Sequence, residues 1–116
     1  EYLKSAYRTD QFIQELWQWT QSKPAYKNKT TFLITTDHGR GTVPVDTWRS
    51  HGDEIPGADQ IWLAVVGPDT PSTGEQTSAG QLYQSQVAKT AAAFLGVEYA
   101  NEKKVGEVVG TALRIK

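Results

Sequence analysis

The two histidines of this chain are the residues whose type and setting point most directly to chemistry. His38 follows Asp37 and precedes Gly39, directly after an apolar run, and His51 precedes Gly52 further along the chain. Neutral imidazole binds Zn, Mn or Fe, and a carboxylate adds an oxygen ligand for a hard or borderline cation. Glycine lets the backbone bend so that neighbouring side chains converge on one ion. The sequence therefore predicts a metal-dependent hydrolase with Asp37, His38 and His51 as metal ligands.

A structural interpretation of the same stretch stays open beside this one. Asp-His-Gly is a triplet of common residue types, and surface loops contain such triplets by chance. Trp48 is expected to be a core or loop-anchoring aromatic residue. Arg40 and Arg49 are expected at the surface, with anion binding as the alternative. The other acids of the stretch are expected to be solvated or to form turns: Asp46, Asp53 and Asp59.

Helices are predicted on both sides of this stretch. Apolar residues at helical spacing predict a helix over residues 1–23, which Pro24 ends because proline cannot continue it. Thr9 could instead cap a shorter helix that begins there. A second helix is predicted over residues 83–95, with Gly96 as its carboxy-terminal cap.

Strands are predicted where β-branched and aromatic residues gather. Residues 31–36 and 60–66 have continuous apolar centres, which favours burial on both faces, as in an α/β sheet. Residues 67–81 read as a loop rich in Pro, Gly, Ser and Thr. Residues 97–99 are expected to start a short edge strand. Residues 103–116 fit either a weak helix or a tail packed along the surface.

The order helix, strand, loop, strand, helix predicts part of an α/β/α layered domain. Residues 37–59 lack periodicity, and a long irregular stretch in a compact domain is usually functional or disordered. Functional loops in open α/β sheets gather at the carboxyl ends of strands, where Asp37 and His38 fall. Because two strands make a poor sheet alone, we expect residues 1–116 to form a single partial domain. The missing strands would come from the rest of a parent chain or from a second copy.

Composition narrows the classes of partner. A formal charge of −1 and a pI near 6.1 argue against nucleic acid as the main partner. No apolar run reaches membrane-spanning length. The absence of cysteine excludes disulfides and thiolate zinc sites. A hydrophobic content of 38% is low for an independent domain. With Glu1 first and no methionine, we expect the natural start to lie upstream.

Three segments in order resemble the carboxy-terminal part of the alkaline phosphatase superfamily. They are TTDHGRG at residues 35–41, Ser-His-Gly at residues 50–52 and IWLAVVGP at residues 61–68. That group includes phosphatases, type I phosphodiesterases/nucleotide pyrophosphatases, sulfatases and cofactor-independent phosphoglycerate mutases. Two flanking segments are similar to the family's neighbouring helices, residues 10–17 and 86–96, so that the likeness covers roughly residues 5 to 100.

The resemblance implies a phosphoesterase that uses two divalent metal ions, Zn or Mn. Asp37 and His38 would bind one ion and His51 the other, and each ion would need further ligands from upstream. The family's Ser or Thr nucleophile also lies upstream, and its Asp-x-x-x-His motif does not occur in residues 1–36. We therefore expect the isolated chain to be inactive and to bind metal weakly or not at all. Phosphodiester or phosphate-monoester hydrolysis is favoured. The resemblance is compatible with a periplasmic or secreted parent, but the sequence itself does not indicate the compartment.

Other functions remain open at this stage. A sulfatase-type member would act on sulfate esters with the same residues. A non-catalytic interaction domain would keep the fold and lose the chemistry, with its exposed sheet covered by a partner or a self-dimer. A mononuclear metal domain would use Asp37, His38 and His51 as a facial set on one ion.

Overall fold

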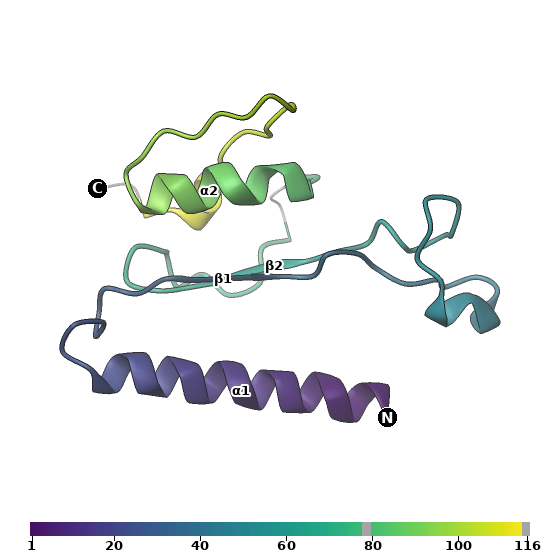
Figure 1. Ribbon diagram of the computed structural model, residues 1–116, viewed down its shortest axis with the longest axis horizontal. Coiled ribbons are helices and arrows are strands. Elements are labelled where there is room, and N and C mark those ends of the chain that lie inside the picture. The colour runs from purple at the N-terminus through teal and green to yellow at the C-terminus, as the bar shows by residue number, and fades with distance from the viewer. Residues whose placement is uncertain (78–79, 115–116) are drawn as a thin grey trace. The chain divides into compact units, whose positions relative to one another are not determined.

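The computed structural model describes residues 1–77 and 80–114. The chain divides into two compact units, Glu1–Thr30 and Thr31–Lys116. The first contains the long helix α1, Tyr2–Ser22. The second contains the strands β1, Phe32–Thr35, and β2, Leu63–Val66, and the helix α2, Val87–Phe94 (Figure 1). Within the described residues, no helix combines the length and the apolar character needed to cross a bilayer.

Helix α1 spans Tyr2–Ser22, which confirms the helix predicted over residues 1–23. Thr20 is its buried residue, and its hydroxyl donates to the carbonyl of Trp17 at 2.7 Å. Lys23 is already extended, with φ −106° and ψ 123°. The ring of the following Pro24 disfavours helical backbone at Lys23, so the helix ends where the sequence predicts.

Strands β1, Phe32–Thr35, and β2, Leu63–Val66, form an antiparallel two-stranded sheet. Phe32 pairs with Val66 at one end and Thr35 with Leu63 at the other. The Thr35 hydroxyl donates to the carbonyl of Trp62 at 2.7 Å, which continues the contact past the last pair. The coarse α/β class is therefore confirmed, although the second strand begins at Leu63 and not at residue 60.

Burial of both sheet faces, predicted from the apolar centres of the strands, is not observed among the described residues. All four residues of β1 are half-buried. Val66 at the end of β2 is 44% exposed and Trp62 just before it is 53% exposed. A two-stranded sheet cannot cover its own faces, and both faces become buried only when further layers pack against them. The sheet therefore carries apolar side chains that the described residues leave partly uncovered.

The predicted helix over residues 83–95 is present as a short 3₁₀ turn and an α-helix. The turn η2 spans Gln84–Gln86 and α2 spans Val87–Phe94. The Gln86 side chain accepts a hydrogen bond from the backbone N–H of Tyr83 at 2.7 Å, which satisfies a donor at the start of the turn. Gly96 follows with φ +67°, the left-handed conformation of a carboxy-terminal cap, as predicted.

The last described segment packs along α2 and does not form a helix of its own. The fully buried Thr90 hydroxyl donates to the carbonyl of Gln86 at 2.7 Å and accepts from the N–H of Val109 at 3.0 Å. Regular structure after α2 is confined, in the described part, to the 3₁₀ turn η3, Gly110–Ala112. The surface-tail alternative therefore holds over residues 103–114, while Ile115 and Lys116 lie outside the described residues.

The edge strand predicted over residues 97–99 is wrong. These residues are irregular and form no ladder with any described strand. A strand needs the backbone groups of a neighbour, and the two-stranded sheet does not extend to this segment.

Candidate functional site

The long connection between β1 and β2 folds back on itself beyond one end of the sheet (Figure 1). Its regular element is the 3₁₀ turn η1, Val45–Arg49. Backbone N–H groups on the outgoing arm donate to carbonyls on the returning arm, from Gly41 to Ser50 and from Thr42 to Pro56, both at 2.9 Å. These bonds satisfy backbone groups that would otherwise need water, so the loop is a folded structure and not an open excursion.

Glycines permit the two arms to approach this closely. A Cβ atom at Gly39 would overlap the carbonyl oxygens of Gly57 and Gln60. A Cβ atom at Gly41 would overlap the backbone and side chain of Thr47. Gly57 itself has φ +93°, which an L side chain rarely adopts. Glycine is thus required at these positions for the loop to close.

Closure of the loop brings His38 and His51 into direct contact. Their ring centroids lie 3.9 Å apart and the ring planes are inclined by 15°, a stacked arrangement. The Nδ1 atom of His38 lies 2.7 Å from the carbonyl oxygen of Gly39. Because a carbonyl oxygen only accepts, Nδ1 is the donor in this contact, and in the neutral ring with its proton there the lone pair for a cation lies on Nε2.

Asp37 lies beside the Nε2 atom of the His38 ring. Its Oδ1 accepts from the backbone N–H of His38 at 2.9 Å, and its Oδ2 lies 3.7 Å from His38 Nε2. The Asp37 side chain is 85% exposed. The carboxylate therefore stands beside Nε2 and is itself open to solvent. An oxygen and a nitrogen ligand side by side suit a borderline divalent cation.

A residue distant in the sequence forms a hydrogen bond to the backbone of Asp37. The side-chain amide of Gln84, in η2, donates from Nε2 to the backbone carbonyl of Asp37 at 2.9 Å. Sequence reasoning missed this contact, because the two residues are 47 positions apart and glutamine carries no local signal for it.

All three sequence-predicted ligands thus lie in one chain of contacts. Asp37 touches His38, and His38 stacks on His51. Stacked rings present their nitrogens at parallel edges and not to a common point. Accordingly, no group of three or more His, Asp and Glu side chains that could hold one metal ion occurs among residues 1–77 and 80–114.

The same loop carries a cluster of two arginines on one tryptophan. The guanidinium carbon of Arg49 lies 4.8 Å from the ring centroid of Trp48, and that of Arg40 lies 5.9 Å from it. Arg40 also donates from Nη1 to the carbonyl of Trp48 at 3.5 Å. Trp48 is 41% exposed. It therefore anchors the loop, as expected, but from the surface and not from a core.

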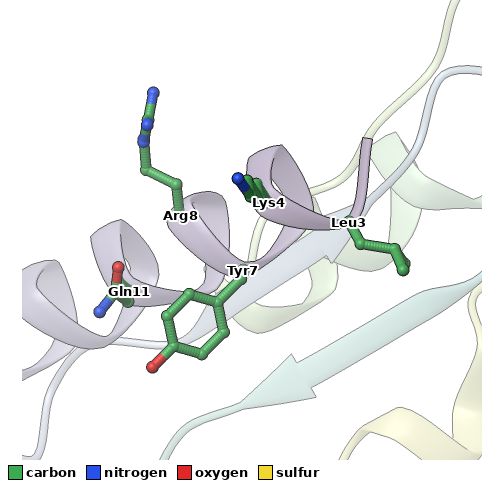
Figure 2. Close-up of a pocket in the computed structure, with 5 residues that line it drawn as sticks. All are labelled: Leu3, Lys4, Tyr7, Arg8 and Gln11. Carbon is green, nitrogen blue, oxygen red and sulfur yellow. The ribbon is translucent and has the colours of Figure 1, made fainter. Parts of the chain in front are cut away.

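A surface pocket on α1 involves none of these residues. It is lined by five side chains from the first turns of the helix, which Figure 2 shows projecting from it: Leu3, Lys4, Tyr7, Arg8 and Gln11. One helix lines it alone, so it lacks the convergence of elements that usually builds a ligand site.

No protein family, curated protein or solved structure was found to match this chain. The likeness to the alkaline phosphatase superfamily therefore depends on residues 35–41, 50–52 and 61–68 and on the segments around them.

Proposed function

We propose that this chain is the carboxy-terminal part of a two-metal phosphoesterase of the alkaline phosphatase superfamily, and that it hydrolyses phosphodiesters or phosphate monoesters as part of the whole enzyme. The observation that carries the proposal is the stacking of His38 on His51 at 3.9 Å. The two histidines lie on the two arms of one long loop. Three glycines at the points of closest approach, Gly39, Gly41 and Gly57, allow the loop to close and bring the rings together.

The geometry supports ligation of two neighbouring ions. In two-metal hydrolases the ions lie about 4 Å apart and clamp the reacting group between them. Two imidazoles at a centroid distance of 3.9 Å are spaced to serve one ion each. Asp37 and His38 would bind one ion, and His51 would bind the other. The ions, Zn or Mn, would polarise the phosphoryl group and activate the nucleophile.

The exposure of the two-stranded sheet supports the proposal that the chain belongs to a larger parent domain. Apolar residues of β1 and β2 are half-buried, or exposed at Val66, in the described chain, which is the state expected when adjoining strands are supplied from elsewhere. The alkaline phosphatase-like α/β/α layering, the remaining metal ligands and the nucleophile would all come with those strands.

A non-catalytic interaction domain is the second candidate. The partly uncovered sheet favours it, because an interaction domain needs an exposed apolar surface for its partner. A sulfatase-type parent shares every residue of the first proposal, and only the substrate separates it.

Turnover of the complete protein separates these candidates. His51→Ala should lower phosphoesterase turnover by orders of magnitude, while circular dichroism shows an unchanged fold. Asp53→Ala, an acid two residues away that is expected to be solvated, is the matched control and should retain activity. Normal turnover in His51→Ala would remove His51 from the site. Activity on sulfate esters alone would establish the sulfatase alternative, and no hydrolysis of either class would leave the interaction domain.

A further inference from the structure

Helix α1 carries two rows of large side chains at helical spacing, and only one of them is withdrawn from solvent. Residues three and four positions apart share a face of a helix. One such row is half-buried or buried: Ile13, Trp17 and Thr20. The row one residue earlier, which we call the outer row, is 59%, 53% and 49% exposed at its members: Phe12, Leu16 and Trp19. A helix that packs on one side only is expected to be polar on its outer side, so α1 is apolar over more of its surface than one neighbour requires.

The outer row continues past the end of the helix. The rings of Trp19 and Tyr26 lie 5.5 Å apart at their centroids and are inclined by 33°, and Tyr26 is itself 47% exposed. Single apolar side chains at a surface are ordinary, but adjoining ones form a patch, and such patches mark interaction sites. The outer row and Tyr26 together therefore form a docking surface.

We propose that this surface is the interface of a homodimer, in which α1 packs antiparallel against α1 of a second copy around a two-fold axis beside Phe12. A two-fold interface uses the same patch on both copies, so every contact between two different residues forms twice. The dimer is separate from the reaction assigned to the histidines and does not depend on it.

The charges beside the outer row select a second copy and its orientation. Arg8 and Glu15 are seven residues apart, two turns of helix, and therefore lie on the same side of the row. Glu1 and Lys23 lie at its two ends. The midpoint of each pair falls at or next to Phe12. Antiparallel packing about that point therefore places Arg8 opposite Glu15 of the second copy and Glu1 opposite Lys23 of the second copy.

These charges remain available for contacts between copies. Within residues 1–77 and 80–114, the ion pairs are Asp37 with His38 and Lys89 with Glu107, so Arg8 and Glu15 have no ion-pair partner there. Both side chains belong to exposed residues. Opposite charges that meet across an interface fix its register, and like charges that meet there are costly.

Other occupants fit the same surface less well. Two parallel copies would place Arg8 beside Arg8 and Glu15 beside Glu15, which sets like charges against each other at both positions. A lipid surface favours helices with Lys and Arg along the polar face, whereas Glu15 lies beside the middle of the outer row. The antiparallel pair of copies is the arrangement in which every charge named above meets its opposite.

Sedimentation equilibrium of the complete protein tests the dimer. We expect a dimer that Arg8→Glu and Glu15→Arg each weaken by about tenfold or more, because each change creates like-charge contacts at two symmetric places. The combined Arg8→Glu, Glu15→Arg variant restores both contacts with their signs exchanged, so its dissociation constant should return close to that of the unmodified protein. Lys103→Glu, the same change of charge at an exposed position in the last described segment, is the control and should leave the dimer unchanged.

Leu16→Glu tests the apolar part of the interface, with circular dichroism to verify the fold. We expect this variant to be monomeric and folded. An unmodified protein that is monomeric at every concentration would overturn the proposal, and lower stability of Leu16→Glu in that monomer would show that another part of the parent chain covers the outer row. A combined charge variant as weak as either single one would overturn the antiparallel arrangement. Because neither metal nor substrate enters these measurements, their failure would leave the two-metal proposal untouched.

Discussion

The rings of His38 and His51 stack with their centroids 3.9 Å apart and their planes inclined by 15°, although a loop separates the two residues in the chain. Backbone hydrogen bonds between the two arms close this loop, and glycines permit the close approach. The contact joins the two halves of the candidate site, so substitutions that loosen the loop should affect the site before they affect the rest of the fold.

Gly39→Ala tests the closure of the loop. The added methyl group would overlap the carbonyl oxygens of Gly57 and Gln60, both of them backbone atoms that cannot turn aside. Overpacking of this kind typically costs about 1–3 kcal/mol. Urea unfolding should therefore show a lower midpoint. Gly110→Ala is the control, because a Cβ there meets nothing within 4 Å. Equal stability of the two variants would show that the loop does not need the close approach.

Thr90→Val tests the attachment of the last described segment to α2. Valine has nearly the shape of threonine, so the change removes the hydroxyl and leaves the N–H of Val109 without its 3.0 Å acceptor. A buried donor left unsatisfied costs about 1–3 kcal/mol. Thr73→Val, at an exposed loop position, should change the free energy of unfolding by little. Thermal unfolding of both variants measures the difference. An unchanged free energy of unfolding in Thr90→Val would show that Thr90 does not attach the segment to α2.

The ion pair between Lys89 and Glu107 should contribute far less, although its atoms are only 3.0 Å apart. The Glu107 side chain is 85% exposed, and solvent-exposed pairs are usually worth about 0–1 kcal/mol. Glu107→Gln should therefore lower the free energy of unfolding by less than Thr90→Val does, and the small effect should shrink as salt is added. A larger loss than that of Thr90→Val would reverse this ranking.

Gln84→Ala tests a positioning role for Gln84. The variant loses the 2.9 Å hydrogen bond to the carbonyl of Asp37, and loss of such supporting contacts commonly weakens metal binding or activity about 10–100-fold. In the complete protein we expect weaker metal affinity with unchanged thermal stability. Gln81→Ala is the matched control, since among the described residues the Gln81 amide donates to its neighbour Leu82 and to no residue of the site. Rescue by added metal would support the positioning role, whereas an unchanged metal affinity would contradict it.

The local features of the fold were predictable because local physics decides them. Pro24 ends α1 through the geometry of its own ring, and the apolar run before Asp37 forms β1. Gly96, in the left-handed conformation, ends α2. Each of these depends on residues within a few positions of one another.

Features decided by distant residues were not predictable in the same way. The strand expected over residues 97–99 failed because pairing depends on a neighbour and not on composition. Sequence gave no sign that Gln84 would contact Asp37 or that Thr90 would be the buried polar link to Val109. Asp37, His38 and His51 were named as one site from their types, but their spacing contained no information on the stacking of the rings.

Metal content of the complete protein tests the central claim most directly. The two-metal account predicts close to two Zn or Mn ions per chain, and about one fewer in His51→Ala, with Asp53→Ala unchanged. Elemental analysis of the purified proteins gives these numbers without any choice of substrate. A complete protein without bound metal, or a His51→Ala variant with the full complement, would contradict the account.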